Sequence, residues 1–520
     1  EDGWSTTDCD KVCSCAEKVY SCRDVFENEK SSSCGECKHD NVIYRNGFKS
    51  VNCYETCECS NGEYNCINLE RGYCKAQGDP HYTTFDGLKY DFMGDCRYLL
   101  SGSSGTDSLP GYTIITQHRA AWTDMPVRMT EHVWITIFSK DSWSGSIIAN
   151  YTVHLFVADP PQGSGRPSKI GAEIINHASN DTIATNEFQN DDFQLTNYIQ
   201  FATVKTWFGL EVRYTASSWR VEVFLPACYS RLTEGLCGDF NNDVSNDLID
   251  RNGTSYESAM VTNWAHTWRT SDSLGCEKGQ DKFEKCTDKV VLDHCGKLSD
   301  ASEMFKPCHP YIDPKPFETE CVFDYCLEKT MRCPMIEQYA TPCLSALRKD
   351  NKLTDDHAIC DWAEKFDCAP TCEDTNMIYG GCVNVCKDIK TCGNRDLDLN
   401  AVCQNENLIV SQCICKTGYY LEDGKCVKTC GCQDQSGRNY PHGFRSSDCD
   451  QVCTCDDGKY TCRSPNADEL KAGSCLTTAQ PTTVAPTTVP TKPTTVEITT
   501  KPTKASTCED LERGYCKAQG

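Results

Sequence analysis

The chain has 520 residues, of which 41 are cysteine, and it carries a formal net charge of −24. So many cysteines predict an oxidising, extracellular compartment; the alternative is a zinc protein, but there are only 11 histidines and no finger-like Cys/His spacing recurs. The acidic balance argues against nucleic acid and anionic membranes as partners, because both require a basic surface. No apolar run approaches the roughly 18 residues of a membrane span.

The N-terminal region consists of cysteine modules, and one of their patterns recurs later in the chain. The spacing Cys-x3-Cys-x-Cys-x6-Cys occurs three times, at Cys9–Cys22, Cys53–Cys66 and Cys449–Cys462, each time after a glycine and an aromatic residue. Modules of this size bury little apolar surface, so disulfides must hold them together. We therefore expect a partial cysteine-rich module at 1–22 and a short one at 23–66.

A long segment without cysteine follows, between Cys96 and Cys228. Such a segment must be stabilised by a hydrophobic core, and its β-branched and aromatic runs predict strands. The predicted strands are YTIITQ, HVWITIF, SIIANYTVHLFV, FQLTNYIQFATV, GLEVRYTA and WRVEVFLP. A helical domain does not fit their composition or period, so we expect an antiparallel sandwich within a domain at 67–276.

The C-terminal half consists of smaller units. Short helices tied by eight cysteines, Cys286 to Cys360, are expected at 277–367, and ten cysteines predict a disulfide-held module at 368–430. A further short cysteine-rich module is expected at 431–475. Residues 476–507 are almost purely Thr, Pro, Val and Lys, which is typical of an O-glycosylated, mucin-like linker. An unmodified flexible linker is the alternative.

Two motifs at the ends of the cysteine-free segment point to a family. GDPHYTTFDGLKYDFMGDCRYLL at 78–100 and EGLCGDFNNDVSNDL at 234–248 resemble the von Willebrand factor type D domain. The eight-cysteine, trypsin-inhibitor-like and short modules follow in the order of a complete D assembly, and 23–66 resembles a von Willebrand C or E module. The resemblance covers nearly the whole chain and implies the group of the IgG Fc-binding protein, zonadhesin and the gel-forming mucins. The implied fold class is multidomain and β-rich.

The resemblance also implies bridges within and between units. The family pairs Cys74 with Cys237, and Cys96 with Cys276 is a reasonable second bridge, whereas Cys228 has no assignable partner. The ten residues LERGYCKAQG at 69–78 recur at 511–520, so 508–520 resembles the start of a next type D domain. The chain is therefore expected to be an excised piece of an array. Cys516 is then expected to pair with a neighbouring unit, with a free thiol as the alternative.

The loop CGDFNNDVSND predicts a calcium site. Oxygen-bearing side chains recur at short intervals along it, and calcium takes about six to eight oxygen ligands. An Asx-rich turn that bonds its own backbone is the alternative. The family places calcium here together with the aspartate of TFDG. The candidate ligands are Asp86, Asp239, Asn241, Asp243, Asn246 and Asp247.

The motif Gly78-Asp79-Pro80-His81 predicts self-cleavage of the chain after Asp79. The carboxylate of Asp79 can attack its own carbonyl carbon, the proline nitrogen is a leaving group once protonated, and His81 can supply the proton. In related proteins this motif breaks itself, and the resulting anhydride can form a crosslink. An intact turn is the alternative. A bridge between Cys74 and Cys237 would hold the two halves together.

Other motifs carry weaker signals. Family members that link through disulfides often carry Cys-Gly-Leu-Cys, but Glu234 replaces the first cysteine here, which argues against disulfide shuffling. The Cys34-Gly-Glu-Cys37 pair is interpreted as structural. Three sequons predict N-glycosylation, at Asn150, Asn180 and Asn252. No catalytic constellation is recognisable, so the only chemistry expected is the cut at Asp79–Pro80.

These features together predict a secreted, calcium-binding, glycosylated repeat of an extracellular mucus, adhesive or filamentous matrix. The expected partners are neighbouring copies of the same repeat and other matrix glycoproteins, with no nucleic acid and no membrane insertion. The alternatives are a cell-adhesion or immunoglobulin-recognition protein on the same scaffold, and a protease inhibitor acting through the trypsin-inhibitor-like module.

Overall fold

The structure is a computed structural model of the chain. It describes residues 5–7, 11–16, 19–24, 37–39, 42–44, 47–60, 63–106, 108–119, 128–140, 147–158, 169–271, 285–300, 304–353, 358–403, 407–434, 439–447 and 451–466. Several residues of the sequence predictions lie outside these ranges: Cys9, Cys34, Cys276, Cys449, the linker 476–507 and the segment 508–520 with Cys516.

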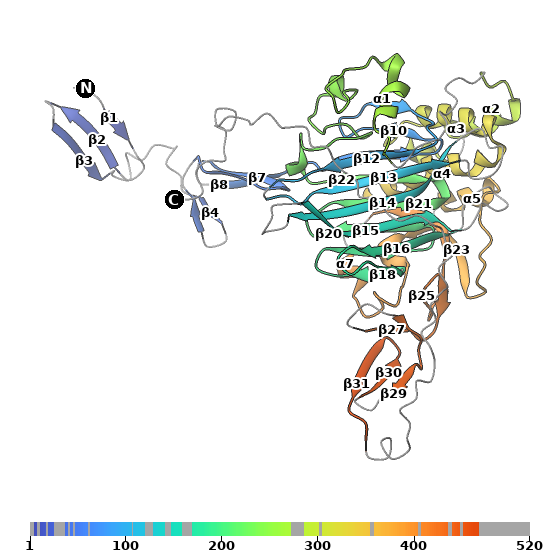
Figure 1. The fold of residues 1–520 in the computed structure, drawn as a ribbon. Coiled ribbons are helices and arrows are strands. Elements are labelled where there is room, and N and C mark those ends of the chain that lie inside the picture. Colours follow the sequence, from blue (N-terminus) through green and yellow to red (C-terminus); the bar gives the residue numbers. More distant parts are fainter. Residues whose placement is uncertain are drawn as a thin grey trace.

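Two antiparallel sheets form the centre of the molecule (Figure 1). The eight-stranded sheet has the order β11-β10-β9-β22-β21-β20-β19-β18, and the six-stranded sheet the order β12-β13-β14-β15-β16-β17. The strands of the first are β9 (Gly72–Gln77), β10 (His81–Thr83), β11 (Lys89–Asp91), β18 (Glu187–Gln189), β19 (Phe193–Asn197), β20 (Phe201–Thr206), β21 (Glu211–Thr215) and β22 (Arg220–Leu225). Those of the second are β12 (Arg97–Ser103), β13 (Tyr112–Arg119), β14 (Met129–Lys140), β15 (Ile147–Val157), β16 (Ile170–Asn176) and β17 (Asp181–Ala184).

The core lies between the two sheets. In β13 buried and half-buried residues alternate from Tyr112 to His118, which is the period of a strand with one face toward the core. Apolar residues of both sheets form one cluster, which also includes Trp264 and Trp268 of the segment around α1 (Val261–Thr267). The expected sandwich and the β-rich, multidomain fold class are confirmed.

One predicted strand is divided in the structure. The run FQLTNYIQFATV forms β19 and β20, which pair as a hairpin. Ile199 takes a positive φ of 77°, and the side chain of Asn197 accepts a hydrogen bond from the Ile199 N–H at 3.0 Å. Asparagine favours such turns because its side chain bonds the backbone two residues on.

A helical module packs against the sandwich. It contains α2 (Lys289–Gly296), α3 (Lys315–Leu327), α4 (Arg332–Lys349) and α5 (Trp362–Lys365). Its core cluster includes Trp219, which follows the short helix η3 (Ala216–Ser218) of the sandwich, together with Met93 and Met129. Helices and sandwich therefore share buried apolar surface. The other short 3-10 helices are η4 (Ala227–Tyr229), η5 (Val244–Asn246), η6 (Ser258–Met260), η7 (Lys306–Cys308), η8 (Lys329–Met331) and η9 (Ala358–Asp361).

Small disulfide-held modules complete the chain. Before the sandwich come β1 (Ser5–Thr7), β2 (Lys11–Ala16), β3 (Val19–Asp24), β4 (Cys37–His39), β5 (Val42–Tyr44), β6 (Lys49–Val51), β7 (Glu55–Ser60) and β8 (Glu63–Asn68). After the helices come β23 (Met377–Asn384), α6 (Val385–Asp388), α7 (Leu399–Val402), β24 (Ile409–Cys415), β25 (Tyr420–Glu422), β26 (Lys425–Val427), β27 (Cys432–Gln433), β28 (Asn439–Tyr440), β29 (Arg445–Ser447), β30 (Val452–Asp456) and β31 (Lys459–Arg463).

The recurring cysteine spacing corresponds to a recurring structure. Cys57 pairs with Cys66 across β7 and β8, and Cys453 pairs with Cys462 across β30 and β31. A glycine precedes each copy, with a positive φ of 84° at Gly47 and 83° at Gly443. Such turns favour glycine because it has no Cβ.

Several disulfides cross the expected module boundaries. Cys53 of the short N-terminal module pairs with Cys228 of the sandwich, which supplies the partner that the sequence left open. Two further bridges, Cys333–Cys368 and Cys360–Cys382, join the helical module to the ten-cysteine module. Neighbouring modules are therefore linked covalently as well as by packing. Among the described residues, no helix has both the length and the apolar character needed to cross a membrane.

Candidate functional sites

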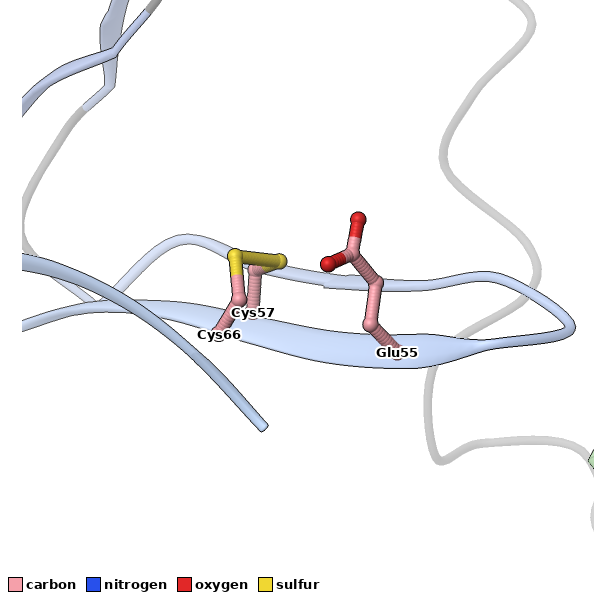
Figure 2. Close-up of side chains that lie close together, drawn as sticks. All are labelled: Glu55, Cys57 and Cys66. Atoms are coloured by element: carbon pink, nitrogen blue, oxygen red, sulfur yellow. A yellow bond between two sulfur atoms is a disulfide. The ribbon is translucent and has the colours of Figure 1, made fainter. Parts of the chain in front are cut away.

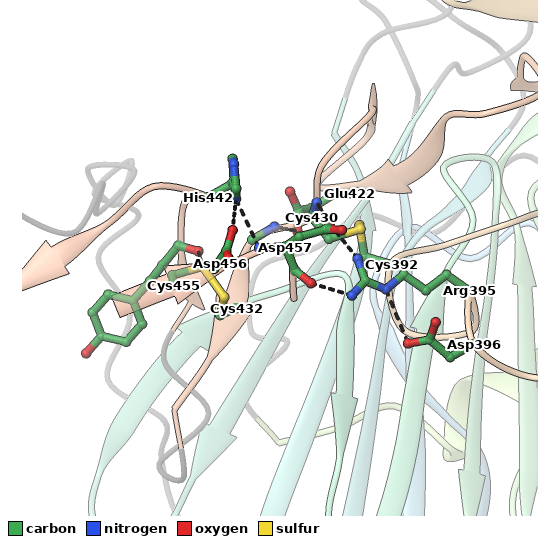
Figure 3. Close-up of polar contacts among 12 residues, drawn as sticks. Cys392, Arg395, Asp396, Glu422, Cys430, Cys432, His442, Cys455, Asp456 and Asp457 are labelled. Carbon is green, nitrogen blue, oxygen red and sulfur yellow. Dashed lines mark hydrogen bonds and ion pairs between the residues drawn. A yellow bond between two sulfur atoms is a disulfide. The ribbon is translucent and has the colours of Figure 1, made fainter. Parts of the chain in front are cut away.

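Four groups of potential metal-ligating side chains come together among the described residues. Two of them contain a disulfide: Cys57–Cys66 beside Glu55, drawn in Figure 2, and Cys392–Cys430, drawn in Figure 3. A disulfide sulfur is not a thiolate, and the thiolate is the form of cysteine that binds metals. The two remaining groups lie beside β10, one in the loops that follow it and one in the turn that precedes it.

The first remaining site is a cluster of three carboxylates. Asp86 follows β10, whereas Asp239 and Asp247 belong to the loop after β22, and one oxygen of each lies within 4.8 Å of the others. Asp86 also holds the loop in place, because its two oxygens accept hydrogen bonds from the backbone N–H groups of Asn241 at 3.0 Å and Asn242 at 2.8 Å.

Close packing at Gly238 allows this arrangement. Gly238 has a φ of 78°, and an added Cβ would collide with Oδ1 of Asp247. The other oxygen of Asp247 accepts a hydrogen bond of 2.6 Å from the Thr84 hydroxyl. The sequence Cys-Gly-Asp therefore places the loop backbone directly against a buried carboxylate.

The cluster has the chemistry of a cation site. Oδ1 of Asp239, of Asn246 and of Asp247 are buried, and no hydrogen bond from the described residues reaches them. Burial and the charge of Asp86 raise the pKa of Asp239, and burial with the charges of Asp86 and Asp239 raises the pKa of Asp247 to about 7. Buried oxygens without donors, and carboxylates that repel one another, fit a hard cation with oxygen ligands.

The other predicted ligands shape the loop. The Asn241 side chain donates to Asp239 at 2.6 Å and accepts from the backbone N–H of Asp243 at 2.7 Å. The exposed carboxylate of Asp243 accepts from the N–H of Ser245 at 3.0 Å and from its hydroxyl at 2.6 Å, at the start of η5. The structure thus brings Asp86, Asp239 and Asp247 together, while Asn241 and Asp243 bond within the loop.

The second site surrounds the turn between β9 and β10, where Gly78, Asp79 and Pro80 are buried. The imidazole of His81 lies among three carboxylates. Its Nε2 is 2.9 Å from Oδ1 of Asp79 and 3.2 Å from Oδ1 of Asp324, and its Nδ1 is 2.7 Å from Oδ1 of Asp91. Asp79 and Asp324 are buried, whereas the side chain of Asp91 is 69% exposed.

The charges of this site are set by burial and by mutual attraction. Burial alone would lower the pKa of His81, but the charges of Asp79 and Asp324 outweigh it and raise that pKa. Burial raises the pKa of Asp324 well above its usual range, and the charge of Asp79 raises it further. The raised pKa values of His81 and of Asp324 both favour the protonated form of the group, so the site tends to hold protons beside Asp79. Such a set can hold and transfer a proton beside the Asp79–Pro80 bond.

Two disulfides span this turn. Cys74–Cys237 joins β9 to the loop after β22, and Cys53–Cys228 joins the preceding module to the same part of the chain. Both connect residues before Asp79 to residues after Pro80. Cys96 is also disulfide-bonded, but its expected partner Cys276 lies outside the described residues.

The predicted glycosylation sites differ in exposure. Asn180 lies in the turn between β16 and β17 with a φ of 59° and is exposed, and Asn252 is exposed in the loop before α1. Asn150 is half-buried within β15. Surface turns are the ordinary setting of an N-linked glycan, so Asn180 and Asn252 have the more suitable surroundings.

The junction after the ten-cysteine module is held by polar contacts (Figure 3). Arg395 forms an ion pair of 2.6 Å with Asp457 at the β30–β31 turn, and Oδ1 of Asp457 also accepts from the backbone N–H of Cys430 at 2.8 Å. Cys430 itself is bridged to Cys392. The closing module is therefore tied to the ten-cysteine module by charge as well as by the chain.

Sequence reasoning missed Asp324, Gln338 and Asp91 at the second site. Asp91 and His81 pair across β10 and β11, so the GDPH motif read together with the following hairpin could have suggested that contact. Asp324 and Gln338 come from α3 and α4, far along the chain. Nothing in the local sequence of a helix indicates that one of its acidic residues faces another module.

Comparison with known proteins identifies the two central units. Residues 74–254 match the von Willebrand factor type D domain, and residues 294–369 match the C8 domain. The human IgGFc-binding protein is 27% identical over 425 residues, which is 78% of this chain and 7% of that protein. Human zonadhesin is 26% identical over 460 residues, covering 85% and 15%, and human alpha-tectorin 25% identical over 428 residues, covering 79% and 18%.

The chain thus spans less than a fifth of the length of each of these relatives. None of their names denotes an enzyme. The chain therefore contains a von Willebrand factor type D domain followed by a C8 domain, and over most of its length it is similar to the IgGFc-binding protein and zonadhesin.

Proposed function

We propose that this chain is a structural repeat of a secreted, glycosylated protein that assembles into an extracellular mucus, adhesive or filamentous matrix. The observation that carries the proposal is the pair of disulfides that join one module to the next: Cys53–Cys228 and Cys360–Cys382. A soluble ligand-binding domain gains little from such links, whereas a unit under mechanical load gains resistance to separation of its modules. Neighbouring copies and other matrix glycoproteins are the partners.

Calcium is the cation of the carboxylate cluster in this proposal. Asp86, Asp239 and Asp247 hold it, and the buried oxygen of Asn246 is a further ligand from the same loop. The support is the set of buried oxygens without hydrogen-bond donors, together with the burial and the neighbouring carboxylate charges that raise the pKa of Asp247. The bound ion stiffens the loop that carries Cys237, and so the strand β9, to which its disulfide partner Cys74 belongs.

The Asp79–Pro80 bond is a self-cleavage site in this proposal. The Asp79 carboxylate attacks the Asp79 carbonyl carbon and closes a five-membered anhydride, the bond from that carbon to the Pro80 nitrogen breaks, and the nitrogen takes a proton from His81. Water, an amine or a hydroxyl group then opens the anhydride. The ion pair of 2.9 Å between His81 and Asp79 supports this assignment.

Two measurements test the proposal. Electron microscopy of the native material should show a filament or gel that disperses on reduction; discrete monomeric particles would reject the matrix function. Mass spectrometry of the reduced protein after mild acid should show fragments 1–79 and 80–520, and the Asp79→Ala variant should stay whole. A single uncut species from the parent chain would reject self-cleavage and leave the matrix function untouched.

A second candidate function is recognition of a specific ligand on the same scaffold. It is favoured by the similarity to a protein named for binding IgG Fc, which covers 78% of this chain. Saturable binding of immunoglobulin by the monomeric chain, together with the absence of filaments, would favour this alternative over the matrix.

A further inference from the structure

The helical module covers the turn at which cleavage is proposed. Gly78 has a φ of 68°, and a Cβ added to it would stand 2.8 Å from Nε2 of Gln338 and 3.0 Å from Oδ2 of Asp324. Gln338 lies on α4 and Asp324 on α3, so two helices of the C8 domain reach the backbone of the type D domain here. The turn is therefore closed from outside by another module.

Asp324 is an unusual residue for its position. It is fully buried on α3, between Cys321 and Cys326, whose disulfides fix the helix. Its Oδ1 lies 3.2 Å from Nε2 of His81, and no hydrogen bond from the described residues reaches its Oδ2. Burying a carboxyl group on folding costs free energy, whereas burying an apolar side chain of similar size would not. Packing of the C8 domain alone thus gives no reason for an aspartate here.

The contacts of Asp324 are instead with the groups of the proposed reaction. The titratable groups that face Asp324 are Asp79 and His81. Asp91 contacts the other imidazole nitrogen of His81, Nδ1. Burial and the Asp79 charge raise the pKa of Asp324, which favours the protonated form of its carboxyl group beside the His81–Asp79 pair. His81 and Asp324 are therefore the two groups of this site that favour holding a proton.

We propose that Asp324 is a positioning residue for cleavage of the Asp79–Pro80 bond, and that docking of the C8 domain completes the cleavage site of the type D domain. This inference rests on the proposed self-cleavage. Asp324 orients Nε2–H of His81, and when His81 gives its proton to the Pro80 nitrogen, the Asp324 carboxyl group returns one to His81. Hydrolysis of the anhydride releases a proton that restores Asp324. A type D domain whose C8 domain is not yet folded therefore stays uncut.

The test follows cleavage in the full chain with Asp324→Asn, which keeps the shape of the side chain and removes its acid. The matched control is Glu320→Gln: Glu320 lies one turn away on the same helix and contacts Gln77 at 3.2 Å rather than the cluster. Reduced samples are analysed by mass spectrometry over time between pH 4 and 8. Circular dichroism and non-reducing peptide mapping report whether each variant is folded, and Asp324→Ser replaces Asp324→Asn should the latter misfold.

We expect the parent and Glu320→Gln to cleave at the same rate and Asp324→Asn to cleave at least about tenfold more slowly. We also expect the Asp324→Asn rate to depend on pH differently, because one proton-holding group is gone. That change would not follow from a merely structural role. An Asp324→Asn rate and pH profile equal to those of the parent would overturn the inference while leaving self-cleavage in place. An uncut parent chain would overturn both.

Discussion

The disulfide between Cys53 and Cys228 provides a quantitative prediction. It links the short N-terminal module to η4, just after the end of β22. The backbone N–H of Ala227 donates to the Cys53 carbonyl at 3.2 Å, and Tyr54, which remains 51% exposed, packs against Gly209. We consider the double variant Cys53→Ser/Cys228→Ser, which removes the bridge without leaving a free thiol.

The expected loss follows from the length of chain that the bridge closes. Cys53 and Cys228 are 175 residues apart, but Cys74–Cys237 already connects the two segments in the unfolded chain. The loop that the Cys53–Cys228 bridge adds therefore runs from Cys53 to Cys74 and from Cys237 back to Cys228, which is only roughly 30 residues. In the chain-entropy model this length corresponds to about 3–4 kcal/mol of stabilisation. The separation of 175 residues taken alone would give about 5 kcal/mol, so the interleaved Cys74–Cys237 bridge decides the magnitude.

Unfolding in guanidinium chloride with the other disulfides intact would measure this loss, and limited proteolysis would show whether the short module is released. The control Cys57→Ser/Cys66→Ser removes a bridge between two residues only 9 positions apart within the module. It should leave the unfolding of the sandwich in guanidinium chloride unchanged. A loss below about 1 kcal/mol in the first variant, with the module still protected from protease, would refute the argument from loop length.

Three further predictions concern the cation, the glycans and pH. Calcium is expected to raise the thermal midpoint of the parent chain, and Asp247→Asn is expected to lose most of that rise. Asp243→Asn should keep the rise, because the Asp243 carboxylate bonds within its own turn. Calorimetry with and without a chelator measures the rise in each variant. Asn180→Gln and Asn252→Gln are each expected to lower the mass of the glycosylated chain by one glycan, because both asparagines are exposed. Stability is expected to fall as the pH drops from 6.5 towards 4, because burial lowers the pKa of His118 to about 4 and the unfolded chain takes up that proton first. This group contributes about 3 kcal/mol, and His118→Gln should flatten the dependence in urea titrations at each pH.

The sequence predicted what depends on local patterns. The alternation of β13, the repeated cysteine spacing and the glycine before each copy are all short-range signals, and each corresponds to a strand, a cross-strand disulfide or a turn in the structure. The loop of the proposed cation site could be predicted for the same reason, because its oxygen-bearing residues Asp239 and Asp247 are only a few residues apart.

Contacts between distant modules could not be predicted in this way. The residues around Cys228 give no indication that it pairs with Cys53. The disulfide forms because the end of β22 lies beside the preceding module in the fold. Asp324 looks like any acidic residue of a surface helix until α3 is packed on the turn at Gly78. The division of the run at Ile199 was hidden because both halves have strand composition.

The bridge from Cys53 to Cys228 determines the route that a pulling force takes through the unit. Tension applied to the N-terminal module passes from Cys53 directly to Cys228, so the 175-residue loop between them, which contains the Asp79–Pro80 bond, carries none of it. A strand of such units would keep its full length and tensile strength after every Asp79–Pro80 bond had been cut, and only a reductant or a break elsewhere would part it.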